Sequence, residues 1–242
     1  MSKIINSGEQ TLLSSISESK AFSRRKFLGY GGAAALGMAM VVSSCGKDDD
    51  PAPPPGAVDL GTGDVGILNY AYALEQLEAA FYIRVFTGTM YSGGSAAETA
   101  LLADIRDHEI AHREFFKNAI PAASRIQDLT PDFSSINFSD RASVLGAAKA
   151  FEDTGVSAYN GAGKLISQTA AGMTYLLLAG KIVSVEARHA AYIRELIAPG
   201  SFADSTAVNG QGLDLIATPP QVVAIANTYL STKISASNLP TS

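Results

Sequence analysis

Two helical segments of this chain place a glutamate and a histidine three residues apart, and this repeated spacing limits the fold more than any other feature. One segment contains Glu109 and His112, and the other contains Glu186 and His189. Residues three apart on an α-helix lie on one face, so each pair presents a carboxylate and an imidazole together. Each pair lies on an otherwise apolar stripe, and a buried carboxylate without a partner is costly. The pattern therefore predicts helices that bring polar groups to one buried site.

Two further helical segments each carry an acid on an apolar side. Glu152 is the acid of one segment, while Glu75 and Glu78 are alternatives in the other, because both lie on apolar stripes. Glu109 follows Glu75 by 34 residues (109 − 75), and Glu186 follows Glu152 by the same 34 (186 − 152). This equal offset is what two similar helical hairpins would produce.

The distribution of helix formers and loop residues predicts an all-α fold. We expect four long helices over the ranges 64–86, 96–119, 140–167 and 172–198. Ser139 is the expected N-cap of the third helix. Residues 121–139 lack a helical period and are too many for a tight turn, and a short helix is expected over 221–230 after two prolines. The order matches a four-helix bundle with a long crossover between helices two and three, plus a short C-terminal helix.

The available donor atoms indicate a metal site built from oxygen and nitrogen. The chain has one cysteine, Cys45, which excludes an intrachain disulfide or a thiolate cluster. Four ionised carboxylates in one core would repel one another, and two divalent cations would balance their charge. Oxygen-rich ligands with two imidazoles suit iron or manganese, with zinc as a further candidate. The alternative is that the acids are paired only through protons and hydrogen bonds.

Four segments of the chain together resemble a known family. They are L-N-Y-A-Y-A-L-E-Q-L-E-A-A-F-Y, D-H-E-I-A-H-R-E-F-F, F-E-D-T-G-V-S-A-Y and V-E-A-R-H-A-A-Y-I-R-E-L. Through them the chain resembles the exported ferritin-like domain proteins, a family that includes desiccation-related proteins. The resemblance covers roughly residues 60–235 and implies a ferritin-like bundle around a dinuclear metal centre.

The resemblance also implies a role for each carboxylate. It favours Glu75 over Glu78 as the first-helix ligand, because an aromatic residue follows Glu75 seven positions later. Glu75 and Glu152 would be terminal ligands. Glu109 and Glu186 would bridge the two metal ions.

The remaining polar residues of the centre follow from the same resemblance. His112 and His189 would each bind one metal ion, and Tyr82 and Tyr159 would lie close to the site. His108 lies off the Glu109 stripe, and we expect it at the surface or behind the ligands.

The resemblance leaves two classes of function open. In the first, the protein is a di-metal oxidoreductase whose centre reacts with dioxygen or peroxide. In the second, it is a non-catalytic stress or desiccation-related envelope lipoprotein that uses the bundle for structure or metal sequestration. A shared fold does not decide between them.

The first part of the chain reads as an export signal. Arg24 and Arg25 lie in a stretch that resembles a twin-arginine motif, and an apolar run over 28–42 follows it. That run is short for a membrane span and suits a signal peptide. It ends at Cys45 in a sequence that resembles a lipobox, which predicts lipid attachment at this cysteine. We therefore expect an exported protein, lipid-anchored in the cell envelope with a periplasmic or outer-surface location.

These observations divide the chain into four regions. We predict a signal region over 1–45, a flexible Asp/Pro-rich tether over 46–63, the bundle domain over 64–235 and a tail over 236–242. The formal charge of −5 and the lack of a Lys/Arg stripe argue against nucleic acid as a partner. Arg194, beside the second Glu-x-x-His pair, is expected at the surface.

Overall fold

The computed structural model of the protein describes residues 53–87, 91 and 94–241. The signal region, Cys45 and the first part of the tether lie outside these residues.

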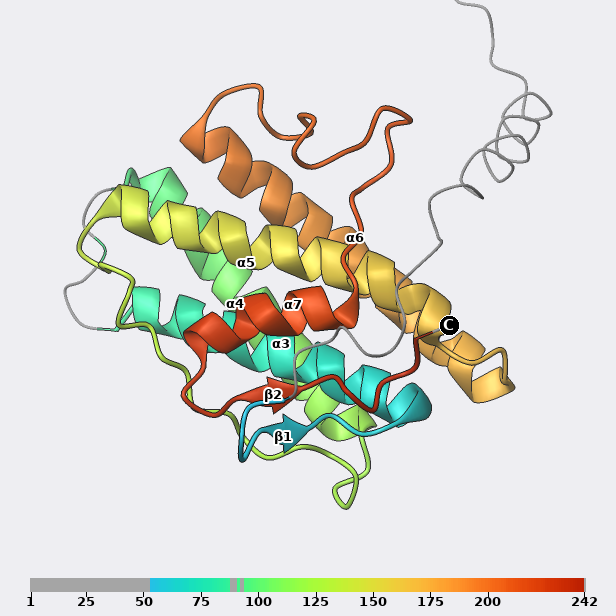
Figure 1. The fold of residues 1–242 in the computed structure, drawn as a ribbon. Helices are drawn as coiled ribbons and strands as arrows, with labels where there is room; N and C mark the ends of the chain where they lie inside the picture. The colour runs from blue at the N-terminus through green and yellow to red at the C-terminus, as the bar shows by residue number, and fades with distance from the viewer. Residues whose placement is uncertain (1–52, 88–90, 92–93, 242) are drawn as a thin grey trace, which may run out of the picture. The chain divides into compact units, whose positions relative to one another are not determined.

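Four long helices form the body of the described chain. They are α3 (Gly63–Val85), α4 (Ala96–Ala119), α5 (Arg141–Ala162) and α6 (Ala170–Ile197). Helix α3 packs along α4, α5 packs along α6, and the two hairpins meet where α3 contacts α5 (Figure 1). Residues 120–140 make the long connection between the hairpins. The predicted all-α bundle with a crossover between its second and third long helices is confirmed.

The third and fourth long helices differ slightly from the ranges predicted for them. Asp140, rather than Ser139, caps α5, because its carboxylate accepts hydrogen bonds from the backbone N–H groups of residues 142 and 143. Helix α5 ends at residue 162 and continues only as the 3-10 turn η1 (Gly163–Leu165). Helix α6 begins two residues earlier than predicted, where the Thr169 hydroxyl accepts a hydrogen bond from the Gly172 N–H.

Two polar side chains of α3 hold the crossover against the bundle. The Asn69 side chain donates to the Ser124 carbonyl at 2.8 Å and accepts from the Ile126 N–H at 3.1 Å. Two helical turns further along α3, the side-chain oxygen of Gln76 accepts a hydrogen bond from the Leu129 N–H at 2.8 Å. Both side chains are buried, so their hydrogen bonds satisfy backbone groups of the crossover that have no partner within a helix.

The chain ends in short elements that close one side of the bundle. Helix α7 (Pro219–Ala226) packs against α5 and α3 and is followed by the 3-10 turn η2 (Asn227–Tyr229). This corresponds to the predicted short C-terminal helix, which ends a few residues earlier than expected. Figure 1 shows α7 lying across the two hairpins.

Described structure continues beyond both predicted ends of the bundle domain, residues 64 and 235. Strand β1 (Val58–Asp59) pairs in parallel with β2 (Ile234–Ser235), so ordered structure begins before residue 63. Leu60 is fully buried, and Leu239 of the predicted tail is buried against Gly66. The physical reason is that these leucines bury apolar surface that neither segment could cover alone.

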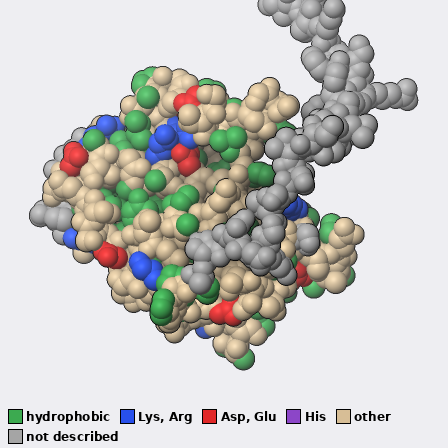
Figure 2. All heavy atoms as spheres, viewed as in Figure 1, with side chains coloured by type: hydrophobic (Ala, Val, Ile, Leu, Met, Phe, Trp, Pro, Cys, Tyr) green, Lys and Arg blue, Asp and Glu red, His purple; other side chains and the backbone are tan. Residues whose placement is uncertain are grey.

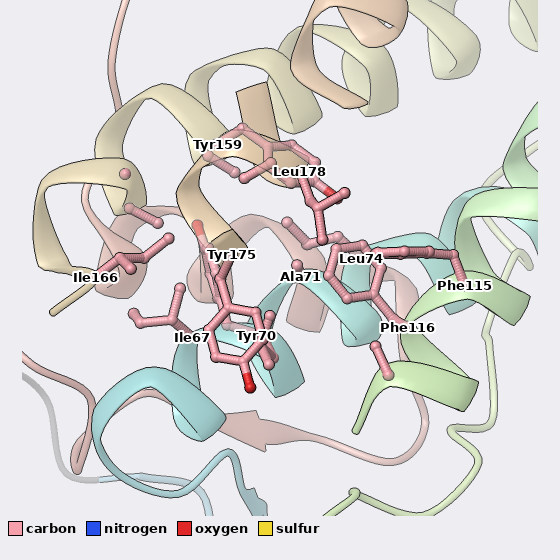
Figure 3. Close-up of a pocket in the computed structure, with 16 residues that line it drawn as sticks. Ile67, Tyr70, Ala71, Leu74, Phe115, Phe116, Tyr159, Ile166, Tyr175 and Leu178 are labelled. Carbon is pink, nitrogen blue, oxygen red and sulfur yellow. The ribbon is translucent and has the colours of Figure 1, made fainter. Parts of the chain in front are cut away.

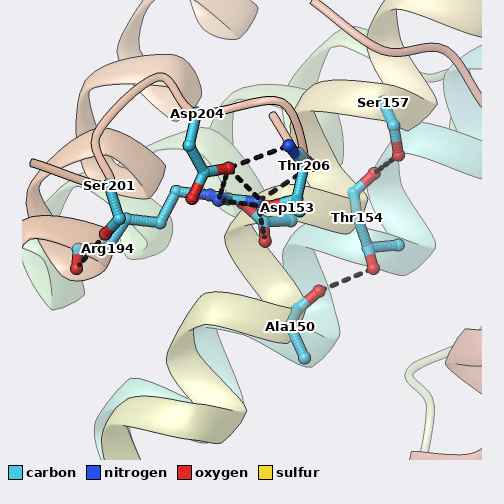
Figure 4. Close-up of polar contacts among 8 residues, drawn as sticks. All are labelled: Ala150, Asp153, Thr154, Ser157, Arg194, Ser201, Asp204 and Thr206. Carbon is cyan, nitrogen blue, oxygen red and sulfur yellow. Dashed lines mark hydrogen bonds and ion pairs between the residues drawn. The ribbon is translucent and has the colours of Figure 1, made fainter. Parts of the chain in front are cut away.

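The loop after α6 is tied to the bundle by a buried arginine. Arg194 is 2% exposed, contrary to the predicted surface position, and its guanidinium forms a two-point ion pair with Asp153 of α5, with both distances at 2.7 Å. It also donates to the Thr206 carbonyl at 3.1 Å and to Asp204 at 3.3 Å (Figure 4). Because a planar guanidinium has five donors, one side chain can satisfy the helix and the loop together.

Apolar residues remain on the surface of this loop and of α6. Phe202 is 59% exposed and Ile216 is 68% exposed. On the face drawn in Figure 2, apolar side chains lie among a few charged ones. By length and composition alone α6 could cross a membrane. Its C-terminal half buries Glu186, His189 and Arg194, which suits a helix of the bundle core.

Candidate metal centre

The structure brings six acidic and imidazole side chains from four helices to one place in the core. They are Glu75 of α3, Glu109 and His112 of α4, Glu152 of α5, and Glu186 and His189 of α6. All four carboxylates are 0% exposed. These are the six residues that the resemblance assigns as ligands.

The six side chains form two overlapping groups, each of a size that could hold one metal ion. The first consists of Glu75, Glu109, His112 and Glu186, and the second of Glu109, Glu152, Glu186 and His189. Within each group, one ligand atom from every residue lies within 4.8 Å of the others. Glu109 and Glu186 belong to both groups, as carboxylates that bridge two ions would.

Each histidine turns its Nδ1 atom toward the carboxylates. His112 Nδ1 lies 2.9 Å from Glu186 Oε1 and 3.4 Å from an oxygen of Glu75 and of Glu109. His189 Nδ1 lies 2.8 Å from Glu109 Oε1 and 3.4 Å from Glu152 Oε2.

Two tyrosines support the terminal carboxylates across the bundle. The Tyr82 hydroxyl of α3 donates to Glu152 Oε1 of α5 at 2.5 Å, and the Tyr159 hydroxyl of α5 donates to Glu75 Oε1 of α3 at 2.5 Å. Each tyrosine thus holds one oxygen of a carboxylate and leaves the other oxygen directed at the centre. Tyr82 and Tyr159 therefore lie where the resemblance places them.

The donor atoms of the cluster fit metal ions better than they fit one another. Among the described residues, eleven buried side-chain nitrogen and oxygen atoms make no hydrogen bond, and eight of them belong to the six clustered residues. They include both oxygens of Glu109, both oxygens of Glu186 and Nδ1 of each histidine. Buried polar atoms are normally hydrogen-bonded. These nitrogen and oxygen atoms lie close together without hydrogen-bond geometry. This arrangement argues against pairing through hydrogen bonds alone and favours cations between the atoms.

Electrostatics also favour cations at the centre, because the buried carboxylates outnumber the two histidines beside them. Burial and then the neighbouring carboxylates raise the pKa of Glu186 well above its ordinary value. Burial also raises the pKa of Glu75 to about 7, even though His112 and Tyr159 act against it. Without metal, protons must supply the positive charge, whereas two divalent cations would offset four carboxylates.

The histidines respond to the same excess of negative charge. Burial lowers the pKa of His112, but Glu109, Glu186 and Glu75 outweigh it and raise that pKa to about 12. Burial and the carboxylates act in the same opposed way on His189, whose pKa rises to about 10. Metal binding requires neutral imidazoles, so bound ions would displace these protons.

Glu78 is a fifth buried carboxylate beside the centre. Burial and then Glu186 raise the pKa of Glu78 well above its ordinary value, and its Oε2 makes no hydrogen bond. Gly155 of α5 makes room for it, because a Cβ atom there would lie 2.9 Å from Glu78 Oε1. Glu75 belongs to a clustered group and Glu78 to neither, which favours Glu75 as the first-helix ligand.

His108 contacts His189 at the ring nitrogen that does not face the carboxylates. Its Nδ1 lies 2.9 Å from His189 Nε2, and the two rings are stacked with centroids 5.2 Å apart. If His189 offers Nδ1 to a metal, its Nε2 carries the proton and donates it to His108. The sequence predicts His108 at the surface or behind the ligands, and this contact with His189 places it behind a ligand.

A cavity between α4 and α6 connects this part of the centre with solvent. Its volume is about 370 Å³, and its lining includes Asp104, His108, His112, Arg188 and His189. Leu101, Ile105 and Val185 also line this cavity, so its charged and imidazole groups share the wall with apolar side chains.

Comparison with known proteins agrees with this architecture. The family model described as ferritin-like domain matches residues 63–199, which is more than half of the chain and spans all six clustered residues. Comparison with curated proteins finds no match.

Proposed function

The chain belongs to the ferritin-like domain family, and from this premise we propose that its bundle holds a dinuclear centre of iron or manganese that reacts with dioxygen or peroxide. The observation that carries the proposal is the sharing of Glu109 and Glu186 between two four-residue groups. A ligand set of carboxylates with two imidazoles suits these metals, and zinc is a further candidate.

The chain's own residues would prepare the centre in three ways. Tyr82 and Tyr159 hold the terminal carboxylates in position, and His108 would fix the tautomer of a metal-bound His189 by accepting its Nε2 proton. Burial keeps competing water away from the carboxylates. A bound pair of metal ions would supply the ability to bind and polarise an oxygen ligand between them.

We further propose that the protein is exported and anchored to a membrane by a lipid on Cys45. The support is the twin-arginine-like and lipobox-like sequence of residues 23–45, which lies outside the described residues. Labelled palmitate should enter the wild-type protein in a Gram-negative host and should not enter Cys45→Ala. Equal labelling of the two would reject lipid attachment at this residue.

The second candidate is a non-catalytic envelope protein of the desiccation-related kind. Complete burial of all four carboxylates favours it, because carboxylates closed off from solvent can retain metal ions, or only strengthen the fold, even where the two histidines border a cavity.

The deciding experiment combines metal content with reactivity. Full chain purified from metal-supplied cells should carry about two iron or manganese ions by elemental analysis and should consume peroxide or dioxygen in stopped-flow measurements. The variant Glu109→Ala/His189→Ala should lose both properties while keeping its helical circular dichroism. Glu114→Ala is the matched control, because Glu114 lies on α4 with 45% exposure and pairs with Arg113. Metal-loaded protein that is inert to both oxidants would reject the oxidoreductase and support the non-catalytic function.

A further inference from the structure

The N-terminal half of α6 leaves apolar side chains on the surface of the bundle. Met173 is 52% exposed, Leu177 is 63% exposed, and Leu176 is 36% exposed. These positions are three and four residues apart, so they lie on one face of the helix. Only 17% of the 18-residue stretch that makes α6 apolar enough to cross a membrane is buried in the described chain, whereas an apolar helix of a protein core is buried. A contiguous apolar face of this kind marks an interaction surface.

The apolar surface extends from α6 onto α4. Phe115 of α4, which is 37% exposed, lines an apolar cavity of about 130 Å³ together with Tyr175 and Leu178 of α6. Figure 3 shows these side chains gathered around a common space that reaches Tyr70 of α3. This cavity shares no lining residue with the cavity at the histidines. The surface on α6 and α4 is therefore apolar down into the bundle and separate from the histidine cavity.

The charged side chains beside this surface are cationic. Residues 154–185 contain no Asp or Glu, although the whole chain has a net charge of −5. Their two charged side chains are Lys164 and Lys181, and both are exposed. Leu176 lies against Gly163, because a Cβ atom there would be 3.5 Å from its Cδ1, and Lys164 is the next residue. Lys181 lies one helical turn beyond the exposed leucines, so lysines border the apolar face on two sides.

Another group of exposed apolar residues, in the loop after α6, has the opposite charge. Leu213 is 60% exposed and Ile216 is 68% exposed. Residues 199–218 contain no Lys or Arg, and their charged side chains are Asp204 and Asp214. Anionic lipids attract lysine and repel aspartate. The face of α6 therefore suits an anionic bilayer, and the loop does not.

A second copy of the chain suits the face of α6 less well than a bilayer does. In a two-fold dimer the same patch meets itself, so Lys164 and Lys181 would face a part of α6 without acids. The acid next to Phe115 on α4 is Glu114, and it already pairs with Arg113 at 2.8 Å. Lipid phosphates would supply the negative charge that a second copy lacks.

The chain enters the bundle at the end where α6 begins. Asp64, at the start of α3, accepts hydrogen bonds from the Ser167 N–H at 2.7 Å and from the Ser167 hydroxyl at 2.6 Å. The Ser167 hydroxyl also lies 2.9 Å from that of Thr169, which caps α6. From this point α3 carries the chain about 35 Å to the other end of the bundle. A lipid on Cys45 would therefore hold the end where α6 begins nearer to the bilayer.

We infer that the N-terminal half of α6, together with Phe115 of α4, is a membrane-binding surface for anionic phospholipid bilayers. The exposed apolar side chains enter the bilayer by about 5–10 Å, to the boundary between headgroups and acyl chains, and the two lysines pair with lipid phosphates. The helix lies against the bilayer and does not cross it, because its C-terminal half buries Glu186 and His189 in the bundle. The orientation of the bundle rests on the proposed lipid anchor, whereas the surface itself does not.

The chain contains no tryptophan, so one introduced tryptophan reports whether its position meets lipid. In the full chain bound to phosphatidylglycerol vesicles, Leu177→Trp should emit at shorter wavelength and lose most of its emission to bromine atoms on the acyl chains. Phe115→Trp is a second reporter on α4 and should also be quenched. Leu213→Trp is the matched control, because Leu213 is 60% exposed and Leu177 is 63% exposed, and it should stay unquenched. Stronger quenching at Leu213→Trp than at Leu177→Trp, or no quenching at either α6 or α4, would overturn the inference.

A second measurement tests the lysines. In the Leu177→Trp background, Lys164→Gln/Lys181→Gln should lower the ratio of quenched to unquenched emission about 25-fold, because each lysine near an anionic surface contributes about fivefold to binding. Lys149→Gln is the control, since Lys149 lies on α5 before the stretch without acids, and it should change nothing. An unchanged ratio in the double variant, or an equal fall in Lys149→Gln, would contradict pairing of these lysines with lipid.

Two further outcomes separate this inference from other occupants and from the proposed function. Shielding of Leu177→Trp without vesicles, in a particle of twice the chain mass that Leu177→Glu returns to one chain, would assign the surface to a second copy and overturn the inference. Quenching in a chain that takes up no palmitate supports the surface and rejects the lipid anchor. Palmitate uptake without quenching rejects the surface and leaves the anchor and the metal centre intact.

Discussion

The two hairpins of the bundle, α3–α4 and α5–α6, are built to one plan but differ at two positions beside the metal centre. Residues 77 apart correspond: Glu75 with Glu152, Glu109 with Glu186, and His112 with His189. The same offset pairs His108 with Val185 and Glu78 with Gly155. The positions that are identical in the two hairpins carry the six candidate ligands, and the two positions that differ lie next to those ligands.

Each difference has a physical consequence in the structure. His108 holds His189 by a 2.9 Å contact, whereas His112 has no such partner among the described residues. A Cβ atom at position 155 would lie 2.9 Å from Glu78 Oε1, so the glycine there leaves space that Glu78 uses. The first hairpin thus supplies both an extra imidazole and an extra carboxylate. The comparison teaches that similar ligands need not make two equivalent metal sites.

The largest expected effect comes from a shared carboxylate. Glu186→Gln should reduce the metal content from about two ions per chain to nearly none, since Glu186 serves both groups. Glu75→Gln should leave about one ion, because Glu75 serves one group. Elemental analysis of both variants measures the number of metal ions that each retains. Equal losses would contradict the division into shared and terminal ligands.

The next effect is the pH dependence of the metal-free protein. Glu75 has a pKa of about 7 in the folded chain against an ordinary 4.5, so folding favours its protonated form. That stability is present below about pH 4.5 and is lost as the pH rises through 7, at up to about 1.4 kcal/mol per pH unit. The raised pKa of His112, about 12, removes further stability above pH 6.5.

Thermal melts from pH 5 to 8 should therefore show a falling melting temperature without metal. Added manganese should raise the melting temperature more at pH 8 than at pH 5, because fewer protons compete for the ligands. Glu75→Gln should fall less steeply in the metal-free melts. A metal-free melting temperature that rises over this range would contradict the assigned shifts.

Removing the extra imidazole should make the two hairpins more alike. His108→Val copies Val185 of the second hairpin, and we expect metal affinity at the His189 group to fall about 10- to 100-fold. Titration against a chelator that resolves two binding steps measures this. His108→Gln should recover part of the affinity, because its side-chain oxygen can accept from His189 Nε2. A change confined to the His112 group would contradict the positioning role.

The smallest effect concerns the extra carboxylate. Burial, followed by Glu186, raises the pKa of Glu78, so Glu78→Gln should stabilise the metal-free protein by about 1–2 kcal/mol, and by more as the pH rises. Gly155→Ala should destabilise it, because the new Cβ would approach Glu78. Urea unfolding of Glu78→Ala, Gly155→Ala and the double variant Glu78→Ala/Gly155→Ala tests the contact. Strict additivity would contradict it.

Much of the fold could be predicted because its signals are local. The second long helix lies at the predicted residues 96–119, since a serine cap and an apolar period mark it. The ends of α5 and α6 moved by a few residues, because Asp140 and Thr169 compete with their neighbours as caps. The pairing of β1 with β2 joins segments about 175 residues apart, and no local pattern reports such a contact.

By itself the sequence determined that four helices present acids and imidazoles from one face each, because helical spacing dictates which residues point together. Only the tertiary structure decided that Glu75 joins the clustered groups while Glu78 stays outside, since both lie on apolar sides of α3. It also decided the contact of His108 with His189, the burial of Arg194 and the apolar cavity at Tyr70. The physical reason is that packing between helices, which sets distances and voids, depends on side chains far apart in the chain.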